Sequence, residues 1–323
     1  MNNRMIRTGI LVAAMTGMVL SAAGCKSKEE AAPEIQEIET EEKAQEESDA
    51  VVFKDMTDRE IVMEEPVEKV VALTAADCEI LYEIGAGDLL VGRGEYCNYP
   101  EEVMDVEAVG SGSETNIEQI IALQPDVVFM STMDQSEDQI NALENAGITV
   151  VVSNAQNIEQ TYTAIQMIGT AVGQEENAKA VVEEMKANFA EIEEKTKGVE
   201  PKRVYFEVSP LEYGLWTAGA GTFMDEMAGM LGLENIFTDI EGWAEISEEQ
   251  VLERNPDYIF TVTMYYGEGP TPEEEIMGRS GWENVTAVAN GSVFPADNDQ
   301  FTRPGPRLDD AVVDMYESIY GEE

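Results

Sequence analysis

Carboxylates are the side chains with catalytic potential that this chain carries in excess. Its 323 residues include 66 Asp and Glu against 19 Lys and Arg, and they include no histidine. Two carboxylates at a suitable separation can hydrolyse a glycosidic bond. With so many acidic residues such pairs arise by chance, and no spacing singles one out. The absence of histidine excludes a serine-histidine nucleophile, histidine-ligated zinc or manganese, and histidine-ligated haem.

The strong negative charge excludes a second group of functions. A net charge of −47 repels nucleic acid and anionic lipid surfaces, so we exclude nucleic acid as a partner. A nucleotide-binding loop is also unsupported. Gly219 and Gly221 precede a predicted helix, but Met224 stands where the dinucleotide fingerprint requires its third glycine. The sequence contains no Walker-type lysine loop either.

Cys25 ends a segment that is typical of a secretion signal. Two arginines precede an apolar stretch over residues 10–20, which is too short to span a membrane, and small residues lead to the cysteine. The run SAAGC resembles a bacterial lipobox, with Ala22 where leucine is usual. That resemblance implies that residues 1–24 are a signal peptide and that the Cys25 thiol takes a diacylglyceryl group. The alternative is a simple secretory signal with a chance cysteine.

The remaining chain is longer than one hydrophobic core usually organises, so we expect two lobes. Before them, residues 25–50 are rich in Glu, Ala, Lys and Gln with few bulky apolar residues, which predicts an acidic disordered tether. Ordered structure is predicted to start at Val51, with two short strands around a polar turn, then a buried strand over residues 69–73. Thr74 and Asp77 have capping-box spacing at the start of a helix.

Two segments, one in each half, have the same organisation. Residues 116–129 and 247–260 each read as a capping residue, a short amphipathic helix, a Pro-Asp turn and a buried strand. The strand over residues 203–208 and a helix capped by Thr222 likewise repeat the strand and helix that follow Lys69. This duplication predicts two related α/β lobes with a cleft between them.

A long helix is predicted between the halves. Residues 175–197 place apolar side chains on one helical face and contain no proline or glycine, so the helix would be roughly 34 Å long at about 1.5 Å per residue. We therefore expect an N-terminal lobe over residues 51–173, a connecting helix over 174–200 and a C-terminal lobe over 201–323. The alternative is an ordinary surface helix within one lobe.

Several motifs in this order resemble the solute receptors of ABC importers for cobalamin and iron chelates. The resemblance spans about Val51 to Tyr320 and is carried by both Pro-Asp segments and by the runs VVAL, EIL, EYCNYP and GPRL. It implies two Rossmann-like α/β lobes with central sheets, joined by one long helix, with the ligand held in the cleft between them. It also implies docking onto a membrane permease whose ATPase subunits supply the energy.

Two acidic residues match the positions at which these receptors meet arginines of the permease. Glu118 and Glu249 each fall at the second position of a predicted helix, one in each half. A carboxylate there is favoured by the helix dipole and the free N–H groups. The alternative is that each glutamate only stabilises its own helix.

The resemblance also assigns ligand contacts. Tyr96 matches a tyrosine lining the cleft of cobalamin receptors, Trp216 and Trp243 match aromatic positions of the second lobe, and Asp299 matches an acidic one. Arg303 is a candidate partner for an anionic siderophore or a carboxylate arm. For the aromatic residues the alternative is core packing.

The sequence departs from the cobalamin receptors in the first lobe. Where those receptors present further tryptophans, this chain has Ser113 or Glu114 and Met130. That leaves room for another corrinoid or a siderophore. The resemblance places Cys78 and Cys97 near the first-lobe side of the cleft, and either a disulfide or two unlinked thiols fits an extracytoplasmic protein.

From these observations we predict a monomeric, extracytoplasmic, lipid-anchored receptor that is not an enzyme and has no cofactor or metal site of its own. Its ligand would be a metal chelate, either a corrinoid or a ferric siderophore. Its partners would be a permease with its ATPase subunits and, through the anchor, the membrane. The alternatives are a lipid-anchored glycosidase with a carboxylate pair and a surface adhesin.

Overall fold

The structure of the protein is a computed structural model. Residues 48–323 form one compact unit, and the structure describes residues 50–132, 137–264, 267 and 269–321. Cys25, the predicted signal peptide and nearly all of the predicted tether lie outside the described residues. Within the described part of the chain, no helix has both the length and the apolar character needed to cross a bilayer.

A four-stranded parallel sheet of order β4-β3-β5-β6 forms the centre of the N-terminal lobe. Its strands are rich in Val and other apolar residues and are largely buried, as expected for a sheet covered on both faces. The predicted pair of short strands forms an antiparallel hairpin, β1 with β2. The strands are β1 Val51–Lys54, β2 Glu60–Met63, β3 Val70–Ala72, β4 Leu90–Arg93, β5 Val127–Met130 and β6 Thr149–Val152. The helices are α1 Ala75–Glu83, α2 Ile117–Leu123, α3 Glu137–Asn145 and α4 Ile158–Ala171.

The C-terminal lobe repeats this plan with a parallel sheet of order β12-β11-β7-β9 and an antiparallel pair, β8 with β10. The strands are β7 Lys202–Glu207, β8 Leu215–Ala218, β9 Leu233–Asn235, β10 Trp243–Ile246, β11 Tyr258–Thr261 and β12 Val293–Pro295. The helices are α6 Phe223–Met230, α7 Glu248–Arg254, α8 Pro272–Met277, α9 Thr286–Asn290, α10 Asn298–Thr302 and α11 Leu308–Tyr320.

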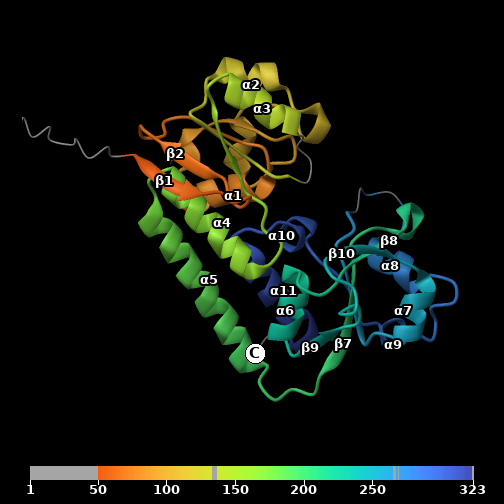
Figure 1. Ribbon diagram of the computed structural model, residues 1–323. Coiled ribbons are helices and arrows are strands. Elements are labelled where there is room, and N and C mark those ends of the chain that lie inside the picture. Colours follow the sequence, from red (N-terminus) through yellow and green to blue (C-terminus); the bar gives the residue numbers. More distant parts are fainter. Residues whose placement is uncertain (1–49, 133–136, 265–266, 268, 322–323) are drawn as a thin grey trace, which may run out of the picture. The chain divides into compact units, whose positions relative to one another are not determined.

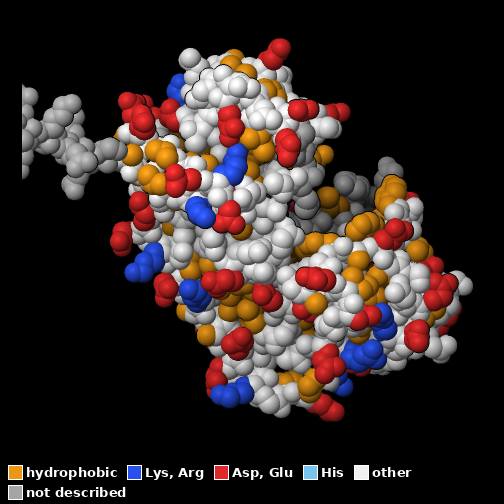
Figure 2. Space-filling view, in the orientation of Figure 1, with side chains coloured by type: hydrophobic (Ala, Val, Ile, Leu, Met, Phe, Trp, Pro, Cys, Tyr) orange, Lys and Arg blue, Asp and Glu red, His pale blue; other side chains and the backbone are white. Residues whose placement is uncertain are grey.

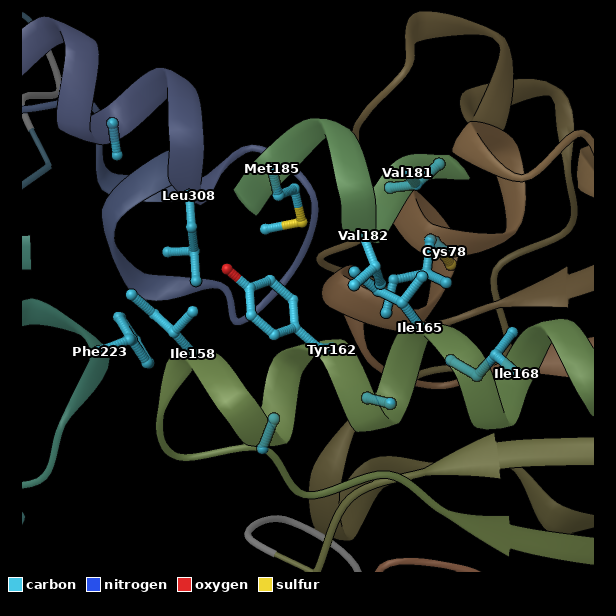
Figure 3. Close-up of a cluster of buried hydrophobic side chains, with 14 of the residues drawn as sticks. Cys78, Ile158, Tyr162, Ile165, Ile168, Val181, Val182, Met185, Phe223 and Leu308 are labelled. Carbon is cyan, nitrogen blue, oxygen red and sulfur yellow. The ribbon is translucent and has the colours of Figure 1, made fainter. Parts of the chain in front are cut away.

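The predicted connecting helix is present as α5, Glu175–Lys195, and runs from one lobe to the other (Figure 1). Its buried face is the predicted apolar stripe, which includes Val182 and Met185. In Figure 3 these two side chains lie beside α4, where Tyr162 and Ile165 are drawn, and Leu308 of α11 lies close by. One continuous hydrophobic core includes residues of both lobes. The lobes are therefore joined by packed side chains as well as by the chain itself. The exact lobe boundaries stay a prediction.

The two Pro-Asp segments form the same structure in both lobes. Asn116 and Ser247 cap α2 and α7 by accepting a hydrogen bond from the N–H three residues later. Each helix ends at a residue in the left-handed conformation, Gln124 or Asn255. The aspartate after the proline then accepts a hydrogen bond from the backbone at the start of a neighbouring strand. The predicted duplication is thus confirmed at the level of individual hydrogen bonds.

Candidate functional site

A pocket of about 200 Å³ lies between the two lobes. Its N-terminal side is formed where the chain leaves the carboxyl ends of β3, β5 and β6, at Thr74, Ser131 and Ser153. The residues that follow two of these positions, 75–77 and 154–156, complete this wall. Ligands of open parallel sheets bind outside the carboxyl ends of the strands, which is where this pocket lies.

The C-terminal side of the pocket combines an aromatic pair with the end of α10. Trp243 begins β10 and Phe223 begins α6, and their ring centroids are 5.4 Å apart at an interplanar angle of 59°. Thr302, Arg303 and Pro304 complete this side. In Figure 2, hydrophobic side chains gather on the C-terminal lobe beside the hollow between the lobes, while acidic side chains are scattered over the rest of this face. The pocket therefore offers one aromatic wall and one polar wall.

A buried carboxylate ties the lobes together next to the pocket. Glu79 of α1 accepts hydrogen bonds from Arg303 Nη1 at 2.7 Å and from Arg307 Nε and Nη2 at 2.9 and 2.7 Å. The guanidinium of Arg307 also lies over the ring of Tyr99, 4.1 Å from its centroid. These contacts join residues more than two hundred positions apart, and the pairing with Arg307 is bidentate.

Arg303 also links the rim of the pocket. Its Nη2 lies 2.6 Å from Asp299 Oδ1, and its Nη1 donates to Asn98 Oδ1 at 2.7 Å. Asn98 in turn donates to Asp299 Oδ2 at 2.8 Å. The backbone carbonyl of Tyr96 accepts a further hydrogen bond from Arg303. The guanidinium that the sequence suggested for an anionic ligand is therefore already engaged with three carboxylate or amide groups of the protein.

Asp77 is the unusual group of the pocket. Only 1% of the residue is exposed, and no described residue donates a hydrogen bond to either carboxylate oxygen. Burial raises its pKa from the ordinary value of 3.8 to about 6. The nearby hydroxyls of Thr74 and Ser153 offset part of that rise in the pKa.

The structure brings four of the five predicted ligand residues to one region. Trp243 and Arg303 line the pocket, while Tyr96 and Asp299 adjoin it through their contacts with Arg303. The side chain of Tyr96 is free to meet a ligand, because 71% of that residue is exposed. Trp216 is 41% exposed on β8 but does not line the pocket.

The structure also shows where the other residues named from the sequence lie. Met130, where cobalamin receptors have a tryptophan, is fully buried in the core of the N-terminal lobe, whereas Ser113 and Glu114 are exposed. Cys78 and Cys97 are free thiols, both buried, and each sulfur lies near the carbonyl oxygen of Ala72. Burial raises the pKa of the Cys78 thiol, so it is held protonated and unreactive.

The two predicted docking glutamates have the expected local geometry. Glu118 and Glu249 are exposed at the second position of α2 and α7. Hydrogen bonds at the helix start, from its own backbone N–H and from Ser247, lower the pKa of Glu249. Both carboxylates therefore lie on the surface, one in each lobe.

Sequence reasoning missed most of the polar wall. Asp77 was recognised only as a capping residue, and Ser153, Asn154 and Gln156 were not recognised at all. A usable signal was present, because a run of polar residues directly follows the buried strand β6. Phe223 was hidden by its place among the apolar residues of α6.

Two parallel-sheet lobes, a long connecting helix and a pocket at their junction define a two-lobed solute-binding protein. Residues 70–300 match the model of the family described as periplasmic binding protein, and the chain belongs to this family. It is a family of extracytoplasmic solute-binding proteins of ABC importers and not of enzymes. The predicted class of protein and its fold are thereby confirmed.

Particular relatives agree with this assignment. A Bacillus subtilis protein named uncharacterized ABC transporter substrate-binding lipoprotein YvrC is 37% identical over 276 residues, covering 84% of this chain and 85% of the relative. The vitamin B12-binding protein of Salmonella paratyphi A is 31% identical over 243 residues, covering 74% and 85%. The crystal structure of the vitamin B12-binding protein BtuF of Vibrio cholerae superposes with a TM-score of 0.65 at 26% identity, covering 78% and 96%. The haem-binding protein HutB of Vibrio cholerae has a TM-score of 0.71 at 19% identity, covering 78% and 98%, which shows a shared fold.

Proposed function

We propose that this protein captures a metal chelate, either a corrinoid or a ferric siderophore, and delivers it to the permease of an ABC importer. The pocket at the junction of the lobes carries this proposal. A corrin ring is broad and flat, with apolar edges and amide arms, so it suits a site with an aromatic face opposite several polar groups. The relatives named vitamin B12-binding proteins support the corrinoid alternative.

A fluorescence titration tests the proposal directly. Purified protein is titrated with cyanocobalamin, dicyanocobinamide, ferrioxamine B and haemin, and tryptophan emission is followed. Trp243→Ala should weaken binding of the chelate that the parent protein takes by about 1–3 kcal/mol without unfolding the protein, because a large apolar contact is lost. Trp216→Ala tests whether the ligand extends beyond the pocket. Failure of the parent protein to bind cyanocobalamin, dicyanocobinamide and ferrioxamine B would refute the proposal, whether or not it binds haemin.

We further propose that Glu118 and Glu249 dock the receptor onto arginines of the permease. Both are exposed carboxylates at helix starts, one per lobe, and the packed core around α5 limits changes in their separation. Glu118→Arg combined with Glu249→Arg should abolish uptake through like-charge repulsion, while binding of the chelate by the free receptor stays unchanged.

The chain offers a matched control for docking. Glu176 is exposed at the second position of α5, the same place in a helix, but on the connecting helix. Glu176→Arg should leave transport into vesicles intact. Full transport by the double variant would remove docking from these glutamates, and joint loss of transport and binding would point to a role in folding.

Anchoring of the receptor to the membrane through Cys25 also belongs to the proposal. It rests on the signal segment and agrees with a relative that is named a lipoprotein. Two acyl chains suffice for stable attachment, so Cys25→Ser should release the protein from the membrane. If the variant still sediments with membranes in high salt, the proposed anchor is wrong.

A further inference from the structure

Asp77 lies in the wall of the pocket, at the third position of α1. Its N–H donates to the capping hydroxyl of Thr74 at 3.1 Å, but its carboxylate has no hydrogen-bond donor among the described residues. The group is fully buried from solvent and yet lines the space between the lobes. Buried polar groups without a partner are rare in folded proteins, and each needs an explanation.

Other helices of this protein show what a carboxylate or amide at this position does when it serves its helix. At α7, Gln250 accepts from the backbone N–H of Ser247, and at α8, Glu274 accepts from that of Thr271. Both capping boxes are complete. At α1 the spacing is the same, but the carboxylate of Asp77 does not return to the capping residue. The side chain is therefore not used by its own helix.

The matching aspartate of the other lobe is satisfied. Asp225 stands three residues after the capping Thr222 of α6, as Asp77 stands after Thr74. Its Oδ1 accepts from Asn235 Nδ2 at 3.1 Å, and its Oδ2 accepts from the backbone N–H of Gly221 at 3.3 Å. An aspartate at this position of the fold can thus be fully hydrogen-bonded within its lobe, and the lack of partners is particular to the copy that faces the pocket.

The charge of the pocket decides what can bind beside Asp77. Arg303 is the cationic residue of the pocket wall among the described residues, and its guanidinium is held by Glu79, Asp299 and Asn98. The carboxylate of Asp77 is therefore not neutralised by its surroundings. A buried acceptor of this kind favours an N–H or O–H donor and disfavours a second carboxylate, which would add an unpaired negative charge.

We propose that Asp77 is a specificity-determining residue that accepts a hydrogen bond from an N–H or O–H group of the bound chelate. It would select amide-bearing or cationic chelates over those that present carboxylates at this depth. This inference rests on the proposed function, since it needs a chelate in this pocket. Its raised pKa agrees with a group that has been desolvated without a partner.

The test compares two variants that make the same chemical change in the two lobes. Asp77→Asn and Asp225→Asn are titrated, beside the parent protein, with cyanocobalamin, dicyanocobinamide and ferrioxamine B, which present N–H donors, and with ferric citrate and haemin, which present carboxylates. Asp77→Asn should weaken binding of the donor-bearing probe roughly 10-fold or more, the effect of removing a hydrogen bond to a charged acceptor. Asp225→Asn should leave that affinity unchanged. Asp77→Ala, which cannot accept at all, should weaken it at least as much.

The outcomes separate this inference from the proposed function. A parent protein that binds none of the probes refutes the function. A parent that binds a donor-bearing probe with the same affinity as Asp77→Asn and Asp77→Ala retains the function and overturns the role of Asp77. Preference of the parent for ferric citrate or haemin also overturns it. Because the parent itself is compared across probes, misfolding of a variant would not remove the test.

Discussion

The starts of α1 and α6 have the same residue types at the same spacing, but the aspartate makes different contacts in the two helices. Thr74 and Thr222 accept hydrogen bonds from the N–H groups of Asp77 and Asp225 at 3.1 and 3.2 Å. The carboxylate of Asp225 then accepts hydrogen bonds from two donors of its own lobe. The carboxylate of Asp77 has no hydrogen-bond donor among the described residues, and Asp77 lines the pocket. The same local motif is completed within the fold in one lobe and left open at the cleft in the other.

The two helices also differ two residues further along the chain. Two residues after Asp77, α1 places Glu79, which binds two arginines of the other lobe. Two residues after Asp225, α6 places Met227, which is fully buried in the hydrophobic core. Helix α1 therefore directs polar groups across the junction of the lobes, while α6 directs its corresponding groups inward.

The largest effect is expected when Glu79 of α1 is replaced by methionine, the residue type at the corresponding position of α6. Among the described residues, Glu79→Met leaves Arg307 without an ion-pair partner and leaves Asp299 as the one carboxylate paired with Arg303. Removing one partner of a buried ion pair should lower the free energy of unfolding by about 3 kcal/mol. Urea unfolding measures the loss. An unchanged midpoint would mean that the cross-lobe contacts contribute no stability.

The sequence predicted the helices of this protein, but not which contacts the carboxylate of Asp77 makes. The helix over residues 175–197 was found at Glu175–Lys195, because an uninterrupted apolar stripe is a local signal. The spacing of Thr74 and Asp77 predicted a capping box, and only half of it forms. Asp77 lines a pocket together with residues 153–156, which lie far away in the sequence.

For the predicted ligand residues too, contacts within one segment can be read from the sequence, whereas contacts between distant segments cannot. The pairing of Asp299 with Arg303 spans four positions of one segment and is visible in the sequence. The pairing of Arg303 with Glu79 spans 224 positions and follows from the way the lobes pack. Resemblance named both Trp243 and Trp216 as ligand contacts; Trp243 lines the pocket and Trp216 does not, and nothing in the pattern distinguished the two.

A second effect, of opposite sign, is expected for Asp77→Asn. The folded-state pKa of Asp77 is raised from 3.8 to about 6, so the folded protein keeps this proton longer than the unfolded chain does. Stability from this group is therefore full below about pH 4 and is lost as the pH rises through about 6. A shift of about two pKa units corresponds to about 3 kcal/mol as an upper bound.

Unfolding of the parent and of Asp77→Asn at pH 4.5 and pH 7.5 measures this term. The variant lacks the carboxylate, so its advantage over the parent should grow from the lower to the higher pH. Taking the difference between the two proteins cancels the groups they share, including Cys78 and Glu79 beside Asp77 and Arg303 across the pocket. An advantage that does not vary with pH would contradict the unpartnered carboxylate.

Asp225→Asn should have a smaller effect, in the destabilising direction. Both oxygens of Asp225 accept hydrogen bonds, and an amide offers one acceptor in their place while its NH₂ group faces a donor. We expect a loss of about 1–2 kcal/mol, measured by thermal unfolding at pH 7.5. Stabilisation by this variant, as expected for Asp77→Asn, would mean that the two aspartates are in equivalent environments after all.

The smallest effect is expected at the turns that end α2 and α7. These two turns have the same backbone conformation but different side-chain contacts. Gln124 and Asn255 end α2 and α7 with φ of 52° and 46°, a conformation that costs a residue with a Cβ roughly 1–2 kcal/mol. Glycine removes that cost but loses more backbone entropy on folding, by about 0.5–1 kcal/mol. Gln124 is exposed, so Gln124→Gly should stabilise the protein by about 0.5 kcal/mol.

Asn255→Gly should not give this gain. Asn255 Oδ1 accepts from the backbone N–H of Thr286 at 2.7 Å, and its Nδ2 donates to the Thr286 hydroxyl at 2.9 Å, so the side chain fastens α7 to the start of α9. Losing these bonds should outweigh the relief of backbone strain, and the melting temperature should fall. The two glycine variants, measured side by side by calorimetry, should therefore move in opposite directions. Equal shifts would show that the turn itself, rather than the contact with Thr286, decides stability at this position.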